Sequence, residues 1–319
     1  GGKHLQRVVG WWCSSDDLVA KDSSIALVEA ESPSQIRDEF EFSGLSVVCT
    51  NPQTDSYADY RCDFELWEVD SGFMMYIGCN VTYSKFFDDG TLRTFLTYGI
   101  DRQTLVDDNY GGLALPTTLP ISPMSPYYSK SLATNYDYDE MRFIDAASKF
   151  RVPTNDKGVP RTLQLLVNSD DSARLRCARN IAATLTELGL ACETVESPTS
   201  VYEARLQAAN YDIYLGITKL PTTADLSEFY RPWGEMSWGG LANETIYNMV
   251  NQSLADRGNY YNLHKLVADD GRIIPVMAGY YAIYAKRGVL SDLNPARDNV
   301  FYYTLGKTME SSKVATQFS

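Results

Sequence analysis

The sequence predicts an α/β fold built on a parallel sheet, and three observations lead to this prediction. Apolar strands alternate with amphipathic helices between residues 161 and 215, which is the pattern of consecutive β-α-β units. The composition, 44% hydrophobic and 22% charged, is that of a soluble globular protein. A length of 319 residues suits one large domain or two lobes and can bury a substantial core.

The β-α-β-α-β unit begins with a strand at 161–167. Ser172 is expected to cap the following helix and Gly189 to end it. Six apolar residues fall on one face of this helix: Leu175, Ala178, Ile181, Ala182, Leu185 and Leu188. The unit is completed by a strand, a helix and a strand at 191–195, 201–209 and 211–215. This alternation of strands and helices predicts one parallel sheet with right-handed crossovers.

The segments on either side of this unit are predicted from the same patterns. The first 80 residues are expected to be rich in β-structure, with a short helix at 34–42 and strands at 25–30, 45–49, 64–69 and 73–78. Asp70, Ser71 and Gly72 favour a turn between the last two strands. Two helices, 244–256 and 259–270, then precede a strand at 280–285, and the tail after Gly288 is expected at the surface.

Residues 91–126 are predicted to form a pair of short helices followed by a proline-rich arm. Leu92, Phe95, Leu96 and Ile100 have the spacing of one buried helical face. Asp101 is placed to cap a second helix that carries Leu105 and Val106, and Gly111-Gly112 to end it. Four prolines between 116 and 126 predict an open, extended loop, because proline lacks the donor that sheets need.

These residues resemble the signature of extracytoplasmic solute-binding proteins of ABC importers, in the class that serves peptides, nickel and related solutes (family 5). The resemblance rests on Arg93, Tyr98-Gly99-Ile100-Asp101-Arg102, Leu105-Val106, Gly111-Gly112 and the prolines at 116–123. Three further segments resemble the family: Trp11-Trp12, the strand that ends before Asn80, and the stretch at 269–276.

The resemblance implies a periplasmic-binding-protein-like fold (type II), mostly the C-terminal lobe with a partial first lobe. On this interpretation residues 1–80 are a β-rich remainder of the first lobe, 81–275 the complete second lobe, and 276–319 a return segment to the first. The chain then corresponds to the C-terminal part of a longer protein. Hinge strands are expected near 80–81 and 275–278, and two lobes would close on the ligand.

Charge and composition exclude several classes of function. The formal charge is −13, from 41 acidic and 28 basic residues, and no basic stripe predicts nucleic-acid binding. No run of residues is long and apolar enough for a membrane span, and no signal-peptide pattern begins the sequence. The six cysteines form no C-x-x-C motif and only two histidines occur, so neither a metal site nor a cofactor is expected. We expect mostly free, buried thiols.

Common catalytic motifs are missing from the sequence. It contains no G-x-S-x-G elbow, no phosphate-binding loop and no G-x-G-x-x-G fingerprint. His264 is the one plausible histidine base and is expected on a polar helix face. Four acidic pairs, at 88–89, 107–108, 170–171 and 269–270, are interpreted as helix-capping or turn residues. We therefore expect no enzyme activity.

A binding site is expected beyond the strand at 211–216, because ligands of open α/β sheets lie past the carboxyl ends of strands. The loop that follows supplies the candidate ligand-binding residues Thr222, Asp225, Tyr230, Trp233 and Trp238. Its aromatic residues are expected to be exposed. Peptide-binding relatives have W-x-x-D here, whereas this chain has Ile217 and then Leu220 or Thr222, so only Asp225 could supply the acid.

The function implied by the resemblance is capture of a small solute outside the cytoplasm and its delivery to an ABC permease. Oligopeptides are the leading ligand, with nickel chelates and oligosaccharides as alternatives. The protein would be periplasmic or lipid-anchored at the outer face of the cytoplasmic membrane, through an anchor that is not part of this sequence. Two other classes stay open: the ligand-sensing domain of a regulator, and an enzyme with an unrecognised site.

Overall fold

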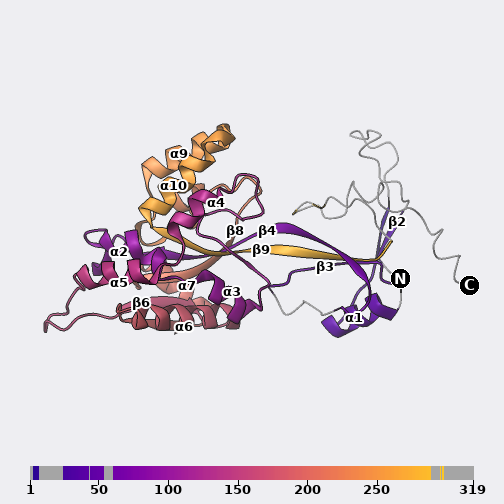
Figure 1. The fold of residues 1–319 in the computed structure, drawn as a ribbon, viewed down its shortest axis with the longest axis horizontal. Helices are drawn as coiled ribbons and strands as arrows, with labels where there is room; N and C mark the ends of the chain where they lie inside the picture. The colour runs from indigo at the N-terminus through magenta and orange to yellow at the C-terminus, as the bar shows by residue number, and fades with distance from the viewer. Residues whose placement is uncertain are drawn as a thin grey trace, which may run out of the picture. The chain divides into compact units, whose positions relative to one another are not determined.

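A computed structural model describes residues 3–6, 24–42, 44–53, 60–288, 295 and 297. The chain divides into two compact units, and each is described by itself (Figure 1). Unit 1 comprises Gly1–Ser71 with Tyr280–Ser319, and unit 2 comprises Gly72–Gly279. The expected lobe boundaries near residues 80 and 275 stay predictions. Trp11, Trp12, Cys13 and nearly all of the tail after Gly288 lie outside the described residues.

Unit 1 contains the helix and the strands that the sequence predicts for it, and also strand β1 (Lys3–Gln6), which the sequence did not predict. Strands β1 and β2 (Ser24–Leu27) form an antiparallel pair. Strand β3 (Val47–Thr50) pairs antiparallel with the end of β9 (Ile273–Lys286). Helix α1 (Pro33–Phe42) buries Phe40, whose ring lies 4.8 Å from that of Tyr60. This contact joins the helix to the segment that leads into β4.

Strand β4 (Phe64–Cys79) corrects the turn predicted at residues 70–72. The structure has one strand of 16 residues where the sequence indicated two. Gly72 takes a left-handed φ of 78°, which only glycine adopts readily, so the chain bends there without leaving the sheet. From Phe73 onward β4 pairs with β8 (Ile213–Lys219) over seven residues.

The β-α-β-α-β prediction is confirmed in unit 2. Strands β6 (Leu163–Asn168) and β7 (Cys192–Ser197) are parallel, and so are β6 and β8. The helices between them are α6 (Ser172–Glu187) and α7 (Thr199–Gln207). The predicted cap of α6, Ser172, was wrong by one residue. Asp171 is the cap, because its side chain accepts the hydrogen bond from the Arg174 backbone amide. The strand order is β9-β4-β8-β6-β7.

Helices cover both faces of the unit 2 strands, as Figure 1 shows with α6 on one side and α9 and α10 on the other. Alternate residues of β4 accordingly enter two different cores. Met75 and Ile77 pack with α3 and α6, whereas Met74 and Tyr76 pack with α9 (Glu244–Ala255) and α10 (Tyr260–Asp270). Burial of each large side chain contributes about 1.5–3 kcal/mol, so the two cores stabilise the sheet from both sides.

Two tyrosine–glycine pairs set the packing between β4 and β8. Tyr76 lies opposite Gly216, and Gly78 lies opposite Tyr214. A Cβ atom on Gly78 would lie 2.2 Å from the Tyr214 ring, so the tyrosine occupies the space that the glycine leaves open. The two rings meet edge to face at 5.7 Å, and their hydroxyls are 3.3 Å apart.

The helix pair of the family signature forms as predicted. It consists of α2 (Thr91–Phe95), the 3-10 turn η2 (Leu96–Gly99) and α3 (Arg102–Tyr110). The predicted apolar face is buried, Asp101 accepts a hydrogen bond from the Thr104 amide, and Gly111 ends α3 with a φ of 57°. The proline arm is less open than expected, because β5 (Leu115–Pro116) pairs with β9.

Arg102 connects this helix pair to β9. Its side chain is 4% exposed and donates to four acceptors: the carbonyls of Pro275, Thr97 and Ile100 and the Thr97 hydroxyl. Burial lowers the pKa of Arg102 to about 10, so the guanidinium stays charged at neutral pH. All four acceptors are uncharged. Buried hydrogen bonds rather than an ion pair therefore hold the signature in place.

The remaining elements are short helices and one helix of intermediate length. They are η1 (Lys85–Phe87), α4 (Lys130–Ala133), η3 (Thr134–Tyr136), α5 (Glu140–Lys149), α8 (Ser227–Tyr230), η4 (Trp238–Gly240) and η5 (Arg257–Asn259). No described helix has the length and apolar character needed to cross a membrane.

The capping interpretation of the acidic pairs is correct at Asp171 and wrong at the last pair. Asp269 and Asp270 end helix α10, where carboxylates do not cap. Asp270 instead pairs with Arg93 at 2.7 Å and with Arg272 at 3.1 Å, and Asp269 accepts a bond from the Tyr136 hydroxyl at 2.6 Å. This pair therefore joins α10 to α2 and to the start of β9.

The five described cysteines are free thiols, as expected. Cys79 and Cys177 are buried, whereas Cys49 is exposed and Cys62 and Cys192 are half-buried. The expectation of buried thiols therefore holds for two of the five.

Replacing Arg102 tests its connecting role. We expect Arg102→Met to lower the free energy of unfolding by about 3 kcal/mol, because buried acceptors lose their donor. Arg142→Met is the matched control: Arg142 is exposed and lies 3.8 Å above the Tyr98 ring, so it should cost about 1 kcal/mol or less. Urea unfolding measures both values. Equal losses in the two variants would contradict the role given to Arg102.

His264 gives a second prediction, because it is 1% exposed rather than on a polar face, and its Nδ1 atom has no hydrogen-bond partner. Burial lowers the pKa of His264 from 6.5 to about 4. Between these values the unfolded chain binds the proton more strongly, so stability should fall as the pH falls from 6.5 to 4. His264→Phe should reduce this fall by about 2 kcal/mol in urea titrations at pH 7 and pH 4.5. The same pH dependence in both proteins would refute this assignment.

Candidate functional site

The carboxyl ends of the parallel strands define one edge of the unit 2 sheet. Strands β6, β7 and β8 end there at Asn168, Ser197 and Lys219. The first unit 2 residues of β4 lie at the same edge, because Phe73 is paired with Lys219 and the Leu220 amide donates to the Gly72 carbonyl at 2.8 Å. We call this the carboxyl edge. It is the place where ligands bind in open α/β sheets.

Two of the three loops at the carboxyl edge are bonded to each other. The side-chain amide of Asn168 donates to Thr199 Oγ1 at 3.0 Å, and the Thr199 hydroxyl donates to Asp170 Oδ2 at 2.7 Å. The Thr199 backbone amide donates to the same carboxylate, and these bonds lower the pKa of Asp170. Asp170 thus holds the loops after β6 and β7 together. The loop after β8 is left as the main source of groups for a ligand.

Thr222 and Asp225 lie near the start of this third loop. Thr222 is exposed. Asp225 is half-buried, and its Oδ1 atom accepts bonds from the Ser227 amide at 2.8 Å and the Ser227 hydroxyl at 2.6 Å. Both residues stay predictions for ligand contact, and Asp225 also has a structural role at the start of α8.

Tyr230 is not the exposed aromatic residue that the sequence predicted. Its side chain is fully buried in the core beside α9 and α10, and its hydroxyl has no hydrogen-bond partner. Burial raises the pKa of Tyr230 well above its usual value. Helix α8 turns this residue inward together with Phe229, so the expectation of exposure was wrong.

Trp233 is presented to solvent by a rigid turn. It is 96% exposed and has a left-handed φ of 60°, which is unusual for a large side chain. Glu228 holds the turn: it accepts two bonds from the Arg231 guanidinium, at 3.0 and 2.8 Å, and one from the Glu235 amide. Backbone strain of this kind is frequent at functional sites, so Trp233 stays a candidate.

Trp238 lies at the opposite edge of the sheet. The adjacent Gly239 accepts a bond from the Thr82 amide at 3.2 Å, and its Cα lies beside Asn80, where β4 ends. A seven-residue strand separates the two edges by about 20 Å. The loop after β8 therefore crosses one face of the sheet, and the five predicted residues do not form one cluster.

The structure adds residues that the sequence reasoning missed. Tyr127 stacks on Tyr260 with ring centroids 5.0 Å apart, and Arg257 donates to the Tyr127 hydroxyl at 2.9 Å. The Tyr260 hydroxyl donates to the Thr223 carbonyl. We call Tyr127, Arg257 and Tyr260 the Arg257 cluster. The sequence shows only that both tyrosines belong to tyrosine pairs, because no local pattern indicates contact over 130 residues.

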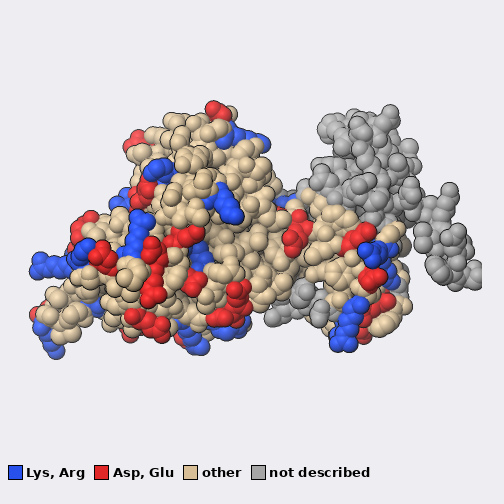
Figure 2. All heavy atoms as spheres, viewed as in Figure 1, with Lys and Arg blue, Asp and Glu red and all other residues tan. Residues whose placement is uncertain are grey.

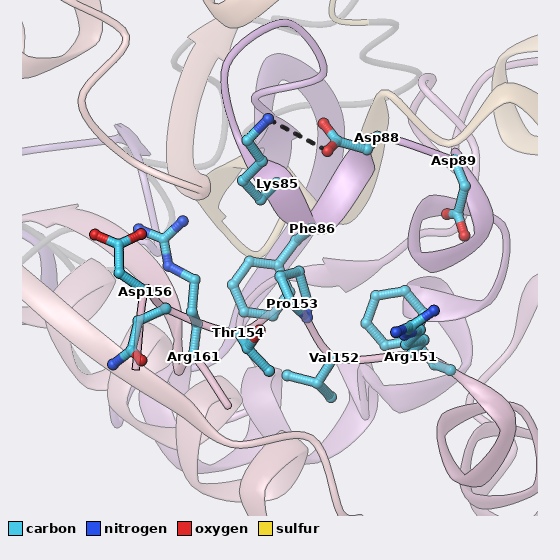
Figure 3. A pocket seen from close by; sticks show the side chains of 12 residues that line it. Lys85, Phe86, Asp88, Asp89, Arg151, Val152, Pro153, Thr154, Asp156 and Arg161 are labelled. Atoms are coloured by element: carbon cyan, nitrogen blue, oxygen red, sulfur yellow. Dashed lines mark ion pairs between the residues drawn. The ribbon is translucent and has the colours of Figure 1, made fainter. Parts of the chain in front are cut away.

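A hollow of about 520 Å³, drawn in Figure 3, is lined by residues of the segment that precedes β6. It therefore lies where the parallel strands begin, and we call this the amino edge. Arg151, Arg161 and Lys85 line it together with Asp88, Asp89 and Asp156, and Phe150, Val152 and Pro153 line its apolar part. Lys85 and Asp88 pair weakly at 3.5 Å. Figure 3 shows these charges spread around the hollow rather than aimed at one point.

Other kinds of site find little support in the part of the chain that the structure describes. Within it, no three His, Cys, Asp or Glu side chains are arranged to hold a metal ion. Acidic and basic side chains are interspersed over the face drawn in Figure 2, without a continuous basic stripe.

Comparisons with known proteins identify the family. Residues 27–240 match the family described as bacterial extracellular solute-binding proteins, family 5 Middle, which is more than half of the chain. A comparison with curated proteins gives no match.

Solved structures with a similar fold share little sequence with this chain. The substrate-binding protein CtaP from Listeria monocytogenes is 14% identical with a TM-score of 0.72, over 96% of this chain and 63% of its own. NikA from Brucella suis is 14% identical (TM-score 0.70; 97% and 66%). The oligopeptide-binding protein AppA from Bacillus subtilis is 15% identical (TM-score 0.62; 91% and 61%).

These structures have the periplasmic-binding-protein-like fold that the sequence predicts, and this chain spans less than two thirds of each. The signature at 93–123 lies within the matched residues, as does most of the loop after β8. Together these findings show that the chain belongs to the bacterial extracellular solute-binding proteins of family 5, a family of binding proteins rather than enzymes.

Proposed function

We propose that this chain is the C-terminal part of an extracytoplasmic solute-binding protein that delivers its ligand to an ABC permease. The observation that carries the proposal is the family match over residues 27–240, which includes all of β4, β6, β7 and β8 and most of the loop after β8. The carboxyl edge supports it, because the loop that leaves this edge carries the exposed Thr222 and the half-buried Asp225.

Oligopeptides are the ligand class that we propose first. The relatives with similar folds include a protein solved with a nonapeptide and another solved with Fe(III)-EDTA, so peptides and metal chelates are both compatible with this fold. Thr222, Asp225 and Trp233 are the proposed contacts. Tyr230 would support the loop from within the core. Trp238 would contact the solute only at the opposite edge of the sheet, away from Thr222 and Asp225.

Binding without catalysis is part of the proposal. The only histidine within the described core, His264, is 1% exposed, so a substrate could not reach it in this conformation. No observation favours a sensor domain over a transport component.

Native mass spectrometry of the full-length protein, purified gently from its producer, tests the function directly. We expect a mass above that of the polypeptide, and after denaturation a heterogeneous set of short peptides. The same preparation exchanged through unfolding and refolding is the control, and it should carry no extra mass. A protein that is empty as purified and ignores peptide and chelate libraries would contradict the proposal.

A further inference from the structure

The one acid predicted for the ligand loop is already engaged within the protein. Asp225 Oδ1 accepts two hydrogen bonds from Ser227, both shorter than 2.9 Å. Leu220, one of the two positions where peptide-binding relatives carry their acid, is 6% exposed and bonded through its amide to Gly72. Thr222, the other position, carries no charge. Neither position that carries the acid in peptide-binding relatives therefore offers a carboxylate to a ligand ammonium group, and Asp225 is already bonded to Ser227.

A cation is held beside the same loop instead. The Arg257 guanidinium donates to the Tyr127 hydroxyl at 2.9 Å and lies 5.5 Å from the centre of that ring. Tyr127 stacks on Tyr260, which donates to the Thr223 carbonyl. Three successive contacts thus connect the guanidinium to Thr223, the residue that follows Thr222. The tyrosine pair keeps a long, flexible side chain in one position.

Arg257 also has unused hydrogen-bonding capacity. Its side chain is exposed, and no carboxylate in the described ranges forms an ion pair with it. The neighbouring Asp256 accepts a bond from the Gly258 amide at 3.0 Å. A guanidinium has five donors in a planar fork, and one of them is used here.

Electrostatics place this cation and the loop acid in one neighbourhood. Burial raises the pKa of Tyr260, the Arg257 guanidinium lowers it, and Asp225 raises it. Both charges therefore act at the Tyr260 hydroxyl. The Asp225 carboxylate accepts hydrogen bonds from Ser227, whereas the Arg257 guanidinium faces solvent.

We propose that Arg257 recognises a carboxylate of the solute, so that the ligand is held by an acidic end rather than by an amino end. A fixed guanidinium fork matches a carboxylate in two parallel hydrogen bonds, and fixing it in advance reduces the entropy lost on binding. The carboxylate belongs to the C-terminus of a peptide or to a metal–polycarboxylate chelate. This inference rests on the proposed function, because it concerns the solute of the same site.

The test compares ligand forms that differ at one end. Isothermal titration of the full-length protein would use random pentapeptides in three forms, free, N-acetylated and C-terminally amidated, and separately nickel citrate. We expect amidation to weaken binding at least tenfold and acetylation less than threefold. Arg257→Gln should bring the ratio of free to amidated affinity close to one. Arg179→Gln is the matched control, because Arg179 is an exposed arginine of helix α6 paired with Glu196, and it should leave the ratio unchanged.

Each outcome separates this inference from the proposed function. Equal binding of free and amidated peptides, or a ratio that Arg257→Gln leaves unchanged, would overturn the role of Arg257 while peptide capture stands. Binding of nickel citrate alone, weakened by Arg257→Gln, would support carboxylate recognition and reject peptides as the ligand. If no form binds, solute capture fails and this inference fails with it.

Discussion

The buried guanidinium of Arg102 is the interaction on which the arrangement of unit 2 depends. It lies between the helix pair and strand β9 and satisfies three carbonyls and one hydroxyl. Pro275 has no amide hydrogen, so it takes part in this hydrogen-bond network only through its carbonyl. The helix pair in turn covers one face of the central strands with Leu92, Leu96 and Ile100. Through Arg102 and these apolar residues, the signature of this family stabilises the fold.

Local sequence patterns predict much of this fold for a clear physical reason. Helix α6 shows its buried face in the spacing of its apolar residues, and strand β6 before it is a nearly continuous apolar run. The errors arose where several residues compete for one role. Asp171 and Ser172 can both cap a helix, and Gly72 suits a turn as well as a bend within a strand.

The candidate site was harder to predict, because it depends on the direction that one long loop takes. Thr222 and Trp238 are 16 positions apart, and the sequence gives no indication that the intervening loop crosses a face of the sheet. The exposure of Tyr230 was predicted wrongly, because aromatic residues in a segment with glycines and prolines are expected in exposed loops. A four-residue helix turns this residue inward instead. The stacking of Tyr127 on Tyr260 is a contact between distant segments that only tertiary structure reveals.

We expect the solute to bind at the carboxyl edge of unit 2 and not in the hollow at the amino edge. Hydrogen–deuterium exchange of the full-length protein, with and without the pentapeptide pool, tests it most directly. We expect slower amide exchange on ligand addition in residues 219–226 and around Tyr127 and Arg257, with no change at 150–161. Protection confined to 85–89 and 150–161, which line the amino-edge hollow, would contradict it.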